Sequence, residues 1–259
     1  MQGFQKVVGH QEIITHLQNA ISMNKVSHAY LFGGESGSGK KMMASLFAMT
    51  LQCEKHGVEP CMECPSCKKA QSQNHPDIIY VKHEKPNTIS IDEIREQLIN
   101  DVMIKPYSSP YKIYIIDEAQ KLTLQAQNAL LKTIEEPPAY AVVMLLADNP
   151  DALLPTISSR CVQLNLKPVG DQLVKDYLMN EMHVPDYQAE VDASLAQGNI
   201  GKAERIARSP EYEETLESAL RMAKYADSMP LYEIVETIKK LTAEKEEWLS
   251  VIAHYNYTL

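Results

Sequence analysis

The stretch AYLFGGESGSGKK, residues 29–41, restricts the fold of this chain more than any other segment. An apolar run with strong β-propensity leads into a loop of the pattern G-x-x-x-x-G-K, and an apolar helical pattern follows it. Backbone N–H groups of such a loop surround a polyphosphate, and its lysine, here Lys40, reaches the outer oxygens. A Gly/Ser-rich turn without a ligand is the alternative. The strand–loop–helix context favours a nucleotide triphosphate site in an α/β fold, a parallel sheet with helices on both faces.

The residue after Lys40 departs from this pattern. A Ser or Thr would place its hydroxyl on Mg²⁺, but the chain has Lys41, and an ammonium group cannot coordinate a metal ion. We therefore expect ATP or ADP binding to be weak or absent and hydrolysis to be lost. The candidate residues of this degenerate nucleotide site are Gly34, Gly37, Gly39, Lys40, Lys41, Asp117 and Glu118.

Five short apolar runs are predicted as strands, and helical patterns separate them. The predicted strands are residues 29–33, 77–81, 111–117, 141–147 and 161–166. The third strand ends in Asp117 and Glu118, at the sheet edge where the glycine loop also lies. In a hydrolase of this type the aspartate orients Mg²⁺ through water and the glutamate polarises the attacking water, whereas two solvated acids are the alternative. A capping box, Ser90-x-x-Glu93, is predicted to open one of the helices.

The chain has five cysteines, and four of them are spaced as C-x7-C-x2-C-x2-C: Cys53, Cys61, Cys64 and Cys67. Four thiolates separated by turn-forming spacers suit tetrahedral Zn²⁺, and they leave no ligand position for water. The sequence therefore predicts a structural zinc site in a module at residues 53–67, with four free thiols as the alternative. We interpret the neighbouring His56 and His75 as surface histidines rather than ligands.

Composition limits the classes of function. A net charge of −9 over 259 residues argues against a basic nucleic-acid-binding protein, so any DNA contact would be local. The N-terminus lacks a signal pattern, and no apolar run reaches the roughly 18 residues of a membrane span, which predicts a cytoplasmic protein.

A change of pattern along the chain predicts its domains. An α/β domain at residues 1–166 is followed by a small helical domain at 167–208 and a further helical segment at 209–259. Within the small helical domain at 167–208, a break between two helices is expected at Gly198 and Asn199.

Arg160 lies in the stretch TISSRCVQL, just before the last predicted strand. By itself this position is typical of a surface arginine or of a partner in a salt bridge. Only a triphosphate bound by a neighbouring chain would give the side chain a catalytic role, as an arginine finger.

Several motifs occur together, in order, between about residues 4 and 208. They are HAYLFGGESGSGKK, the four-cysteine insert, NHPDI, YKIYIIDEAQKLTLQAQNALLKTIEEPP and LPTISSRCVQL. Together they resemble the clamp-loader branch of the AAA+ ATPases. The resemblance implies an AAA+ P-loop fold with a zinc-binding insert, a small helical lid domain and a partial all-α collar domain at the C-terminal end.

The resemblance also implies partners and residue roles. Clamp loaders are five-membered rings that open a sliding clamp and place it on primed DNA, so the chain would join tau/gamma ATPase subunits and a delta subunit in the DNA polymerase III holoenzyme, a DNA-directed DNA polymerase. Arg160, flanked by Ser159 and Cys161, matches the finger that reaches the ATP of the adjacent subunit. The stretch Val8, Gly9 and His10 falls where the family contacts adenine.

Departures from the family pattern predict that this chain is not an ATPase on its own. Lys41 removes the metal-binding hydroxyl, Ala147 stands where active relatives sense the γ-phosphate, and Gly201, beside Lys202, stands where they have a second sensing arginine. An active ATP-hydrolysing subunit of the same family is the alternative. A zinc-centred binding module unrelated to replication is a third interpretation.

Overall fold

The computed structural model describes residues 3–208 and the positions 224, 229, 230, 232, 234, 235 and 238. The chain divides into two compact units, residues 1–169 and 170–259. The predicted C-terminal segment at 209–259 therefore falls almost wholly outside the described residues.

The first unit is built on a sheet of five parallel strands in the order β2-β3-β4-β1-β5. Each strand corresponds to a predicted one and differs from it by one residue at most at either end: β1 Ala29–Gly33, β2 Ile78–Val81, β3 Lys112–Ile116, β4 Ala141–Ala147 and β5 Val162–Asn165. The two central strands next to the glycine loop, β1 and β4, are buried along their whole length. The predicted parallel α/β sheet is confirmed.

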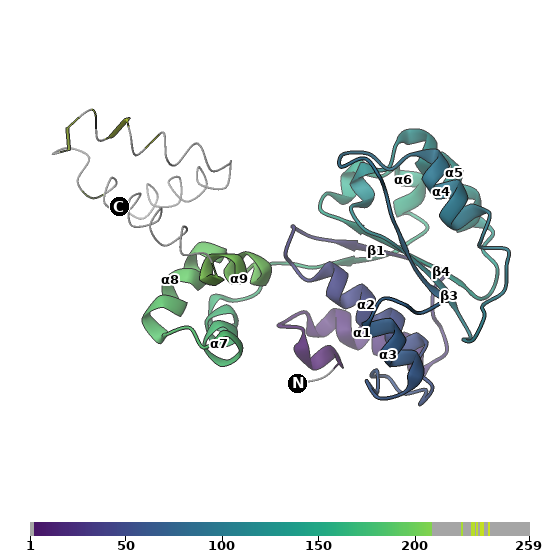
Figure 1. Ribbon diagram of the computed structural model, residues 1–259, viewed down its shortest axis with the longest axis horizontal. Helices are drawn as coiled ribbons and strands as arrows, with labels where there is room; N and C mark the ends of the chain where they lie inside the picture. Colours follow the sequence, from purple (N-terminus) through teal and green to yellow (C-terminus); the bar gives the residue numbers. More distant parts are fainter. Residues whose placement is uncertain are drawn as a thin grey trace. The chain divides into compact units, whose positions relative to one another are not determined.

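Helices cover both faces of the sheet (Figure 1). One face carries α1 (Gln11–Ser22), α2 (Lys40–Leu51) and α3 (Pro65–Gln71), which pack on strand side chains such as Phe32 and Met144. The other carries α4 (Ile91–Ile94), α5 (Leu124–Glu135) and α6 (Pro155–Ser158), which pack on the alternate strand side chains, such as Leu31 and Leu145. Because neighbouring residues of a strand point to opposite faces, strands apolar throughout require two cores.

Short elements complete the first unit. They are the helical turns η1 (Gly3–Lys6), η3 (Ala119–Lys121) and η4 (Pro150–Ala152), and the π-helical turn η2 (Arg95–Ile99) that continues α4. The predicted capping box is present: the Ser90 hydroxyl accepts from the Glu93 N–H, and the Glu93 carboxylate accepts from the Ser90 N–H.

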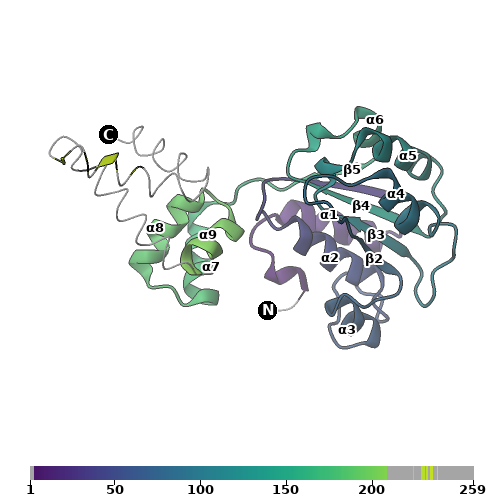
Figure 2. The same cartoon turned by 45° about the horizontal axis from the view of Figure 1, so that its top comes forward.

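The second unit contains α7 (Asp171–Met182), α8 (Asp186–Ala196) and α9 (Ile200–Arg208) (Figure 2). Gln197 and Gly198 adopt left-handed backbone conformations between α8 and α9, which confirms the predicted break. Small and branched apolar side chains, among them Val174, Ala193 and Ile206, are buried between these helices. Of the helices that the structure describes, none has the length and apolar character needed to cross a bilayer.

Candidate functional site

The glycine loop follows the carboxyl end of β1, and its lysine is already engaged. The Lys40 ammonium donates hydrogen bonds to the carbonyls of Gly34 (2.6 Å) and Glu35 (2.8 Å). It also forms an ion pair of 2.7 Å with the carboxylate of Asp148. Asp148 comes directly after β4, which pairs with β1, so the strand order brings this carboxylate to the loop. The Lys40 side chain is 8% exposed.

The backbone of the loop requires glycine. Gly34, Gly37 and Gly39 all have positive φ angles, of 148°, 87° and 98°. A Cβ atom at Gly34 would lie 2.7 Å from the carbonyl oxygen of Leu166, a backbone atom that has little freedom to move. The neighbouring backbone is fixed as well, because the Leu166 N–H donates to the Gly33 carbonyl at 2.7 Å.

Lys41, the residue in the place of the metal-binding hydroxyl, is paired with Asp117. Its Nζ lies 3.0 Å from Oδ2 of Asp117, which follows β3. Oδ1 of the same carboxylate accepts from the N–H of Glu118 at 3.0 Å. Both oxygens of the carboxylate that orients Mg²⁺ in hydrolases therefore have partners from this chain.

Two side chains, Lys121 and His83, contact the Glu118 carboxylate. Lys121 Nζ lies 2.5 Å from one carboxylate oxygen, and His83 Nε2 lies 3.3 Å from the other. The backbone of Glu118 is left-handed, with φ 52°. The structure thus brings the predicted loop, Asp117 and Glu118 to the same edge of the sheet, and each acid has a cation beside it.

Three partners at this edge, Asp148, His83 and Lys121, are absent from the sequence-based set of site residues. Asp148 could have been found, since it follows the predicted strand 141–147 and parallel strands end at a common edge. Lys121 stands three residues after Glu118, a helical spacing that favours an ion pair. Nothing in the sequence around His83 signals its contact with Glu118.

The N-terminal stretch lies against the glycine loop. The His10 ring has a hydrogen bond with the Ser38 backbone, and burial lowers the pKa of His10 nevertheless. Gly9 has a positive φ, and a Cβ there would come within 2.5 Å of Val169. Of the predicted sensor positions, Ala147 is the buried last residue of β4, and Gly201 and Lys202 lie in the first turn of α9.

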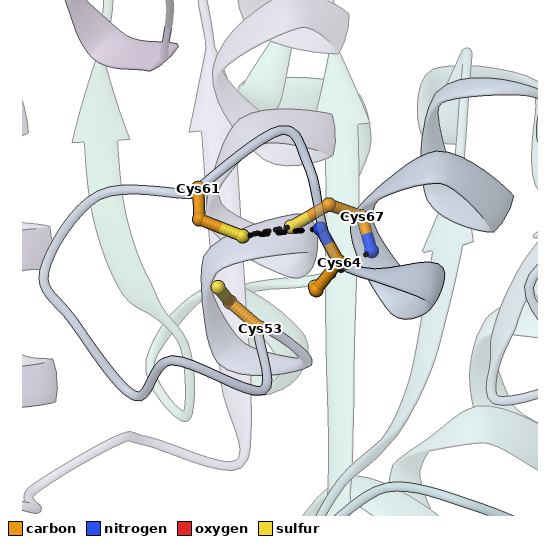
Figure 3. A group of neighbouring side chains, drawn as sticks. All are labelled: Cys53, Cys61, Cys64 and Cys67. Atoms are coloured by element: carbon orange, nitrogen blue, oxygen red, sulfur yellow. Dashed lines mark hydrogen bonds between the residues drawn. The ribbon is translucent and has the colours of Figure 1, made fainter.

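The four cysteines of the predicted zinc module converge (Figure 3). Their sulfur atoms all lie within 4.8 Å of one another, and those of Cys61 and Cys67 are 3.9 Å apart. Tetrahedral zinc with Zn–S bonds of about 2.3 Å requires sulfurs about 3.8 Å apart, so the sulfurs would have to approach one another by at most about 1 Å. The four side chains could hold a metal ion such as zinc with no ligand position left open.

Backbone geometry supports thiolate ligands at this centre. Cys64 caps the N-terminus of α3, where its sulfur accepts from the Cys67 N–H at 3.3 Å. The N–H groups of Cys64 and Glu63 lower the pKa of Cys61 to about 6. Burial raises the pKa of Cys67, so metal binding must displace a proton there.

The interpretation of His75 as a surface histidine is wrong, whereas His56 is exposed as expected. His75 is 5% exposed. Its Nδ1 accepts from the Asp77 N–H at 3.1 Å, which leaves the proton on Nε2, 3.0 Å from the Ser66 hydroxyl of α3. A buried histidine beside α3 can stabilise the cysteine module through hydrogen bonds, and spacing alone does not reveal this.

Arg160 lies after α6 and is tied to its own chain. Its guanidinium lies 2.9 Å from the carboxylate of Glu135, at the end of α5, and donates to the Thr156 carbonyl at 2.9 Å. The side chain is 40% exposed. The adjacent Cys161 is half-buried, and burial raises its pKa to about 12, so its thiol is not a nucleophile at neutral pH.

Comparisons with known proteins match this arrangement. Residues 9–170 match the family described as DNA polymerase III, delta subunit. The chain is 38% identical over 208 residues to the DNA polymerase III subunit tau of Bacillus subtilis, an alignment that covers 78% of this chain and 36% of that protein. It is 35% identical over 207 residues to the delta' subunit of the same organism, covering 80% of this chain and 61% of that subunit. The chain thus spans about a third of one relative and under two thirds of the other.

Solved structures share the fold. The DNA polymerase III gamma subunit-related protein of Thermotoga maritima aligns with a TM-score of 0.50 at 22% identity, covering 92% of this chain and 75% of that one. The Holliday junction branch migration motor RuvB of the same organism aligns with a TM-score of 0.53 at 17% identity, covering 93% and 72%. At these identities the likeness establishes the AAA+ P-loop fold alone.

Proposed function

Because this chain belongs to the DNA polymerase III delta-subunit family, in the clamp-loader branch of the AAA+ proteins, we propose that it acts as a delta-prime subunit that does not hydrolyse ATP. One observation carries the proposal: the four charged residues predicted for the nucleotide site are paired within the chain. Lys40 pairs with Asp148, Lys41 with Asp117, and Glu118 with Lys121.

With these pairs formed, the chain lacks a site for the metal ion and a free carboxylate to position the attacking water. Phosphoryl transfer depends on a divalent ion that neutralises developing charge, and on a residue that positions the attacking water. Lys41 lacks a ligand atom for the ion and neutralises Asp117 instead. Glu118 is held by Lys121 and His83, so its carboxylate is a weaker acceptor for a water proton.

Arg160 would act on the ATP of an adjacent tau/gamma subunit. Exposed ion pairs contribute about 0.2–1 kcal/mol, and both Arg160 and Glu135 are about half exposed. An arginine finger contributes about 10³–10⁵ in rate, or about 4–7 kcal/mol of transition-state stabilisation. The contact with Glu135 is therefore weak enough to be exchanged for a triphosphate.

The remaining parts have supporting roles in this proposal. The cysteine module would hold a structural zinc ion. The chain would work in the cytoplasm, in a five-membered ring with tau/gamma and delta subunits, and would help to place the sliding clamp on primed DNA. In that ring it would be a component of the DNA polymerase III holoenzyme without an activity of its own.

The test is the DNA-stimulated ATPase of a loader reconstituted from tau/gamma, delta and this chain. Arg160→Ala should remove the turnover of the one site that the finger serves, while gel filtration shows the same assembly. Arg95→Ala is the matched control, since Arg95 is an exposed arginine with its own ion pair, to Asp92. Rates should be measured at increasing concentrations of this chain, so that weak association is saturated. An unchanged rate for Arg160→Ala in an intact assembly refutes the finger.

The identity of 38% to a tau subunit favours a second candidate, an ATP-hydrolysing subunit. Turnover of ATP by the purified chain in Mg²⁺, compared with Lys40→Ala, separates the two. Turnover that disappears in Lys40→Ala would replace the non-hydrolysing proposal with the ATPase.

A further inference from the structure

The pair between Lys41 and Asp117 occupies a particular place in the site. In a hydrolytic P-loop, the hydroxyl after the loop lysine and the aspartate at the strand end hold Mg²⁺ between them. Here the ammonium of Lys41, in the first turn of α2, lies 3.0 Å from that aspartate. A positive charge therefore already stands between the loop and the end of β3, where the metal would otherwise stand.

We propose that the Lys41 ammonium substitutes for the divalent cation, so that the loop binds a polyphosphate, such as the triphosphate of ATP, without a metal ion. The proposal rests on the proposed non-hydrolysing function and specifies its ligand. The side chains of Lys41 and Asp117 are 58% and 38% exposed, so a phosphate can reach the ammonium without opening a core.

Magnesium would hinder this binding. The hydroxyl ligand is missing, so the ion would gain little from the protein, and it would bring two positive charges next to the ammonium of Lys41. A divalent ion about 4 Å from an ammonium is repelled, even with the dielectric constant of water, strongly enough to weaken binding about 30-fold. ATP should therefore bind about 30-fold more tightly in EDTA than in excess Mg²⁺.

Asp148 sets the strength of the interaction. The Asp148 carboxylate lies 2.7 Å from the Lys40 ammonium and is 43% exposed. An incoming phosphate must therefore compete with this carboxylate for Lys40, and the negative charge of Asp148 repels it. The site consequently binds weakly in the wild-type chain. Asp148→Asn removes the ion pair of Lys40, which keeps its hydrogen bonds to the Gly34 and Glu35 carbonyls, and should increase the affinity for ATP several-fold, with and without Mg²⁺.

Calorimetric titration of the full chain with ATP and with inorganic tripolyphosphate, each in EDTA and in excess Mg²⁺, tests the proposal. The wild-type chain should bind both probes more tightly in EDTA than in excess Mg²⁺. Lys41→Ser, which restores a hydroxyl, should reverse the preference. Lys25→Ser removes an exposed lysine outside the loop and should behave like wild type. Equal affinities for the two probes would support a site that recognises phosphates alone, and tighter binding of ATP would support the same site with an added contact to the nucleoside.

The proposal is overturned if the wild-type chain binds the probes only in the presence of Mg²⁺. It is also overturned if neither the wild-type chain nor the Asp148→Asn variant binds either probe in EDTA. A Lys41→Ser variant that keeps the wild-type preference overturns it as well. These outcomes are measured on the chain alone and leave the effect of Arg160 on a neighbouring ATPase untouched, so the failures of the two proposals are distinguishable.

Discussion

Asp77→Ala should destabilise the sheet unit. Asp77, in the motif NHPDI, is 1% exposed, and its carboxylate accepts from the N–H groups of Tyr107 (2.6 Å) and Ser108 (2.9 Å) and from the Ser108 hydroxyl (3.2 Å). Each buried N–H left without a partner costs about 1–3 kcal/mol, so two cost about 2–6 kcal/mol. Residues 107 and 108 are exposed overall, and water can replace part of the loss. We therefore expect Asp77→Ala to lower the free energy of unfolding by about 2–4 kcal/mol.

Urea unfolding followed by circular dichroism gives the change in free energy, and hydrogen exchange of β2 and β3 amides assigns the transition to the sheet. With a slope of about 2–3 kcal/mol/M, the midpoint should fall by about 1 M. Asp92→Ala is the control, because this side chain is 87% exposed and its ion pair is long, at 3.8 Å. It should change stability by less than about 0.5 kcal/mol. If Asp77→Ala changes stability no more than Asp92→Ala, the carboxylate does not hold the 107–108 loop.

Three further predictions concern the zinc module and the arginine. The purified chain should contain one zinc ion per molecule by mass spectrometry of the native protein, and Cys67→Ser should lose it and lower the melting temperature; full zinc content in Cys67→Ser would contradict a four-sulfur site. Burial lowers the pKa of His75 below its ordinary 6.5, so the unfolded chain takes up the proton first. The stability contributed by the neutral ring is complete above about pH 6.5 and declines as the pH falls toward the folded pKa, and a His75→Gln variant should lack that decline between pH 7.5 and 5.5. Glu135→Gln should change the ATPase rate of the reconstituted loader by less than about fivefold, the limit for an exposed ion pair, whereas Arg160→Ala should abolish turnover at its site.

The elements that could be predicted depend on residues close together in the chain. The glycine loop, the five strands, the capping box at Ser90 and the convergence of the cysteines each follow from a short pattern whose spacing has one favourable geometry. The order of the elements also predicted the parallel sheet, because a strand–helix–strand connection brings the second strand back parallel to the first.

The sequence by itself thus determined the fold class, the loop, the cluster of four cysteines that could hold a metal ion and the missing hydroxyl at Lys41. Only the tertiary structure decided how the charges of the site are paired. Lys40 and Asp148 are 108 residues apart, and they meet because β4 pairs with β1 and both strands end at the same edge. His75 is buried because α3 and the 107–109 loop pack over it, and Arg160 meets Glu135 because α5 and α6 share one face of the sheet. A pattern specifies which groups a segment carries, but the strand order and the packing of helices determine which groups from distant segments come within a few ångströms, where Coulombic attraction and hydrogen bonding act.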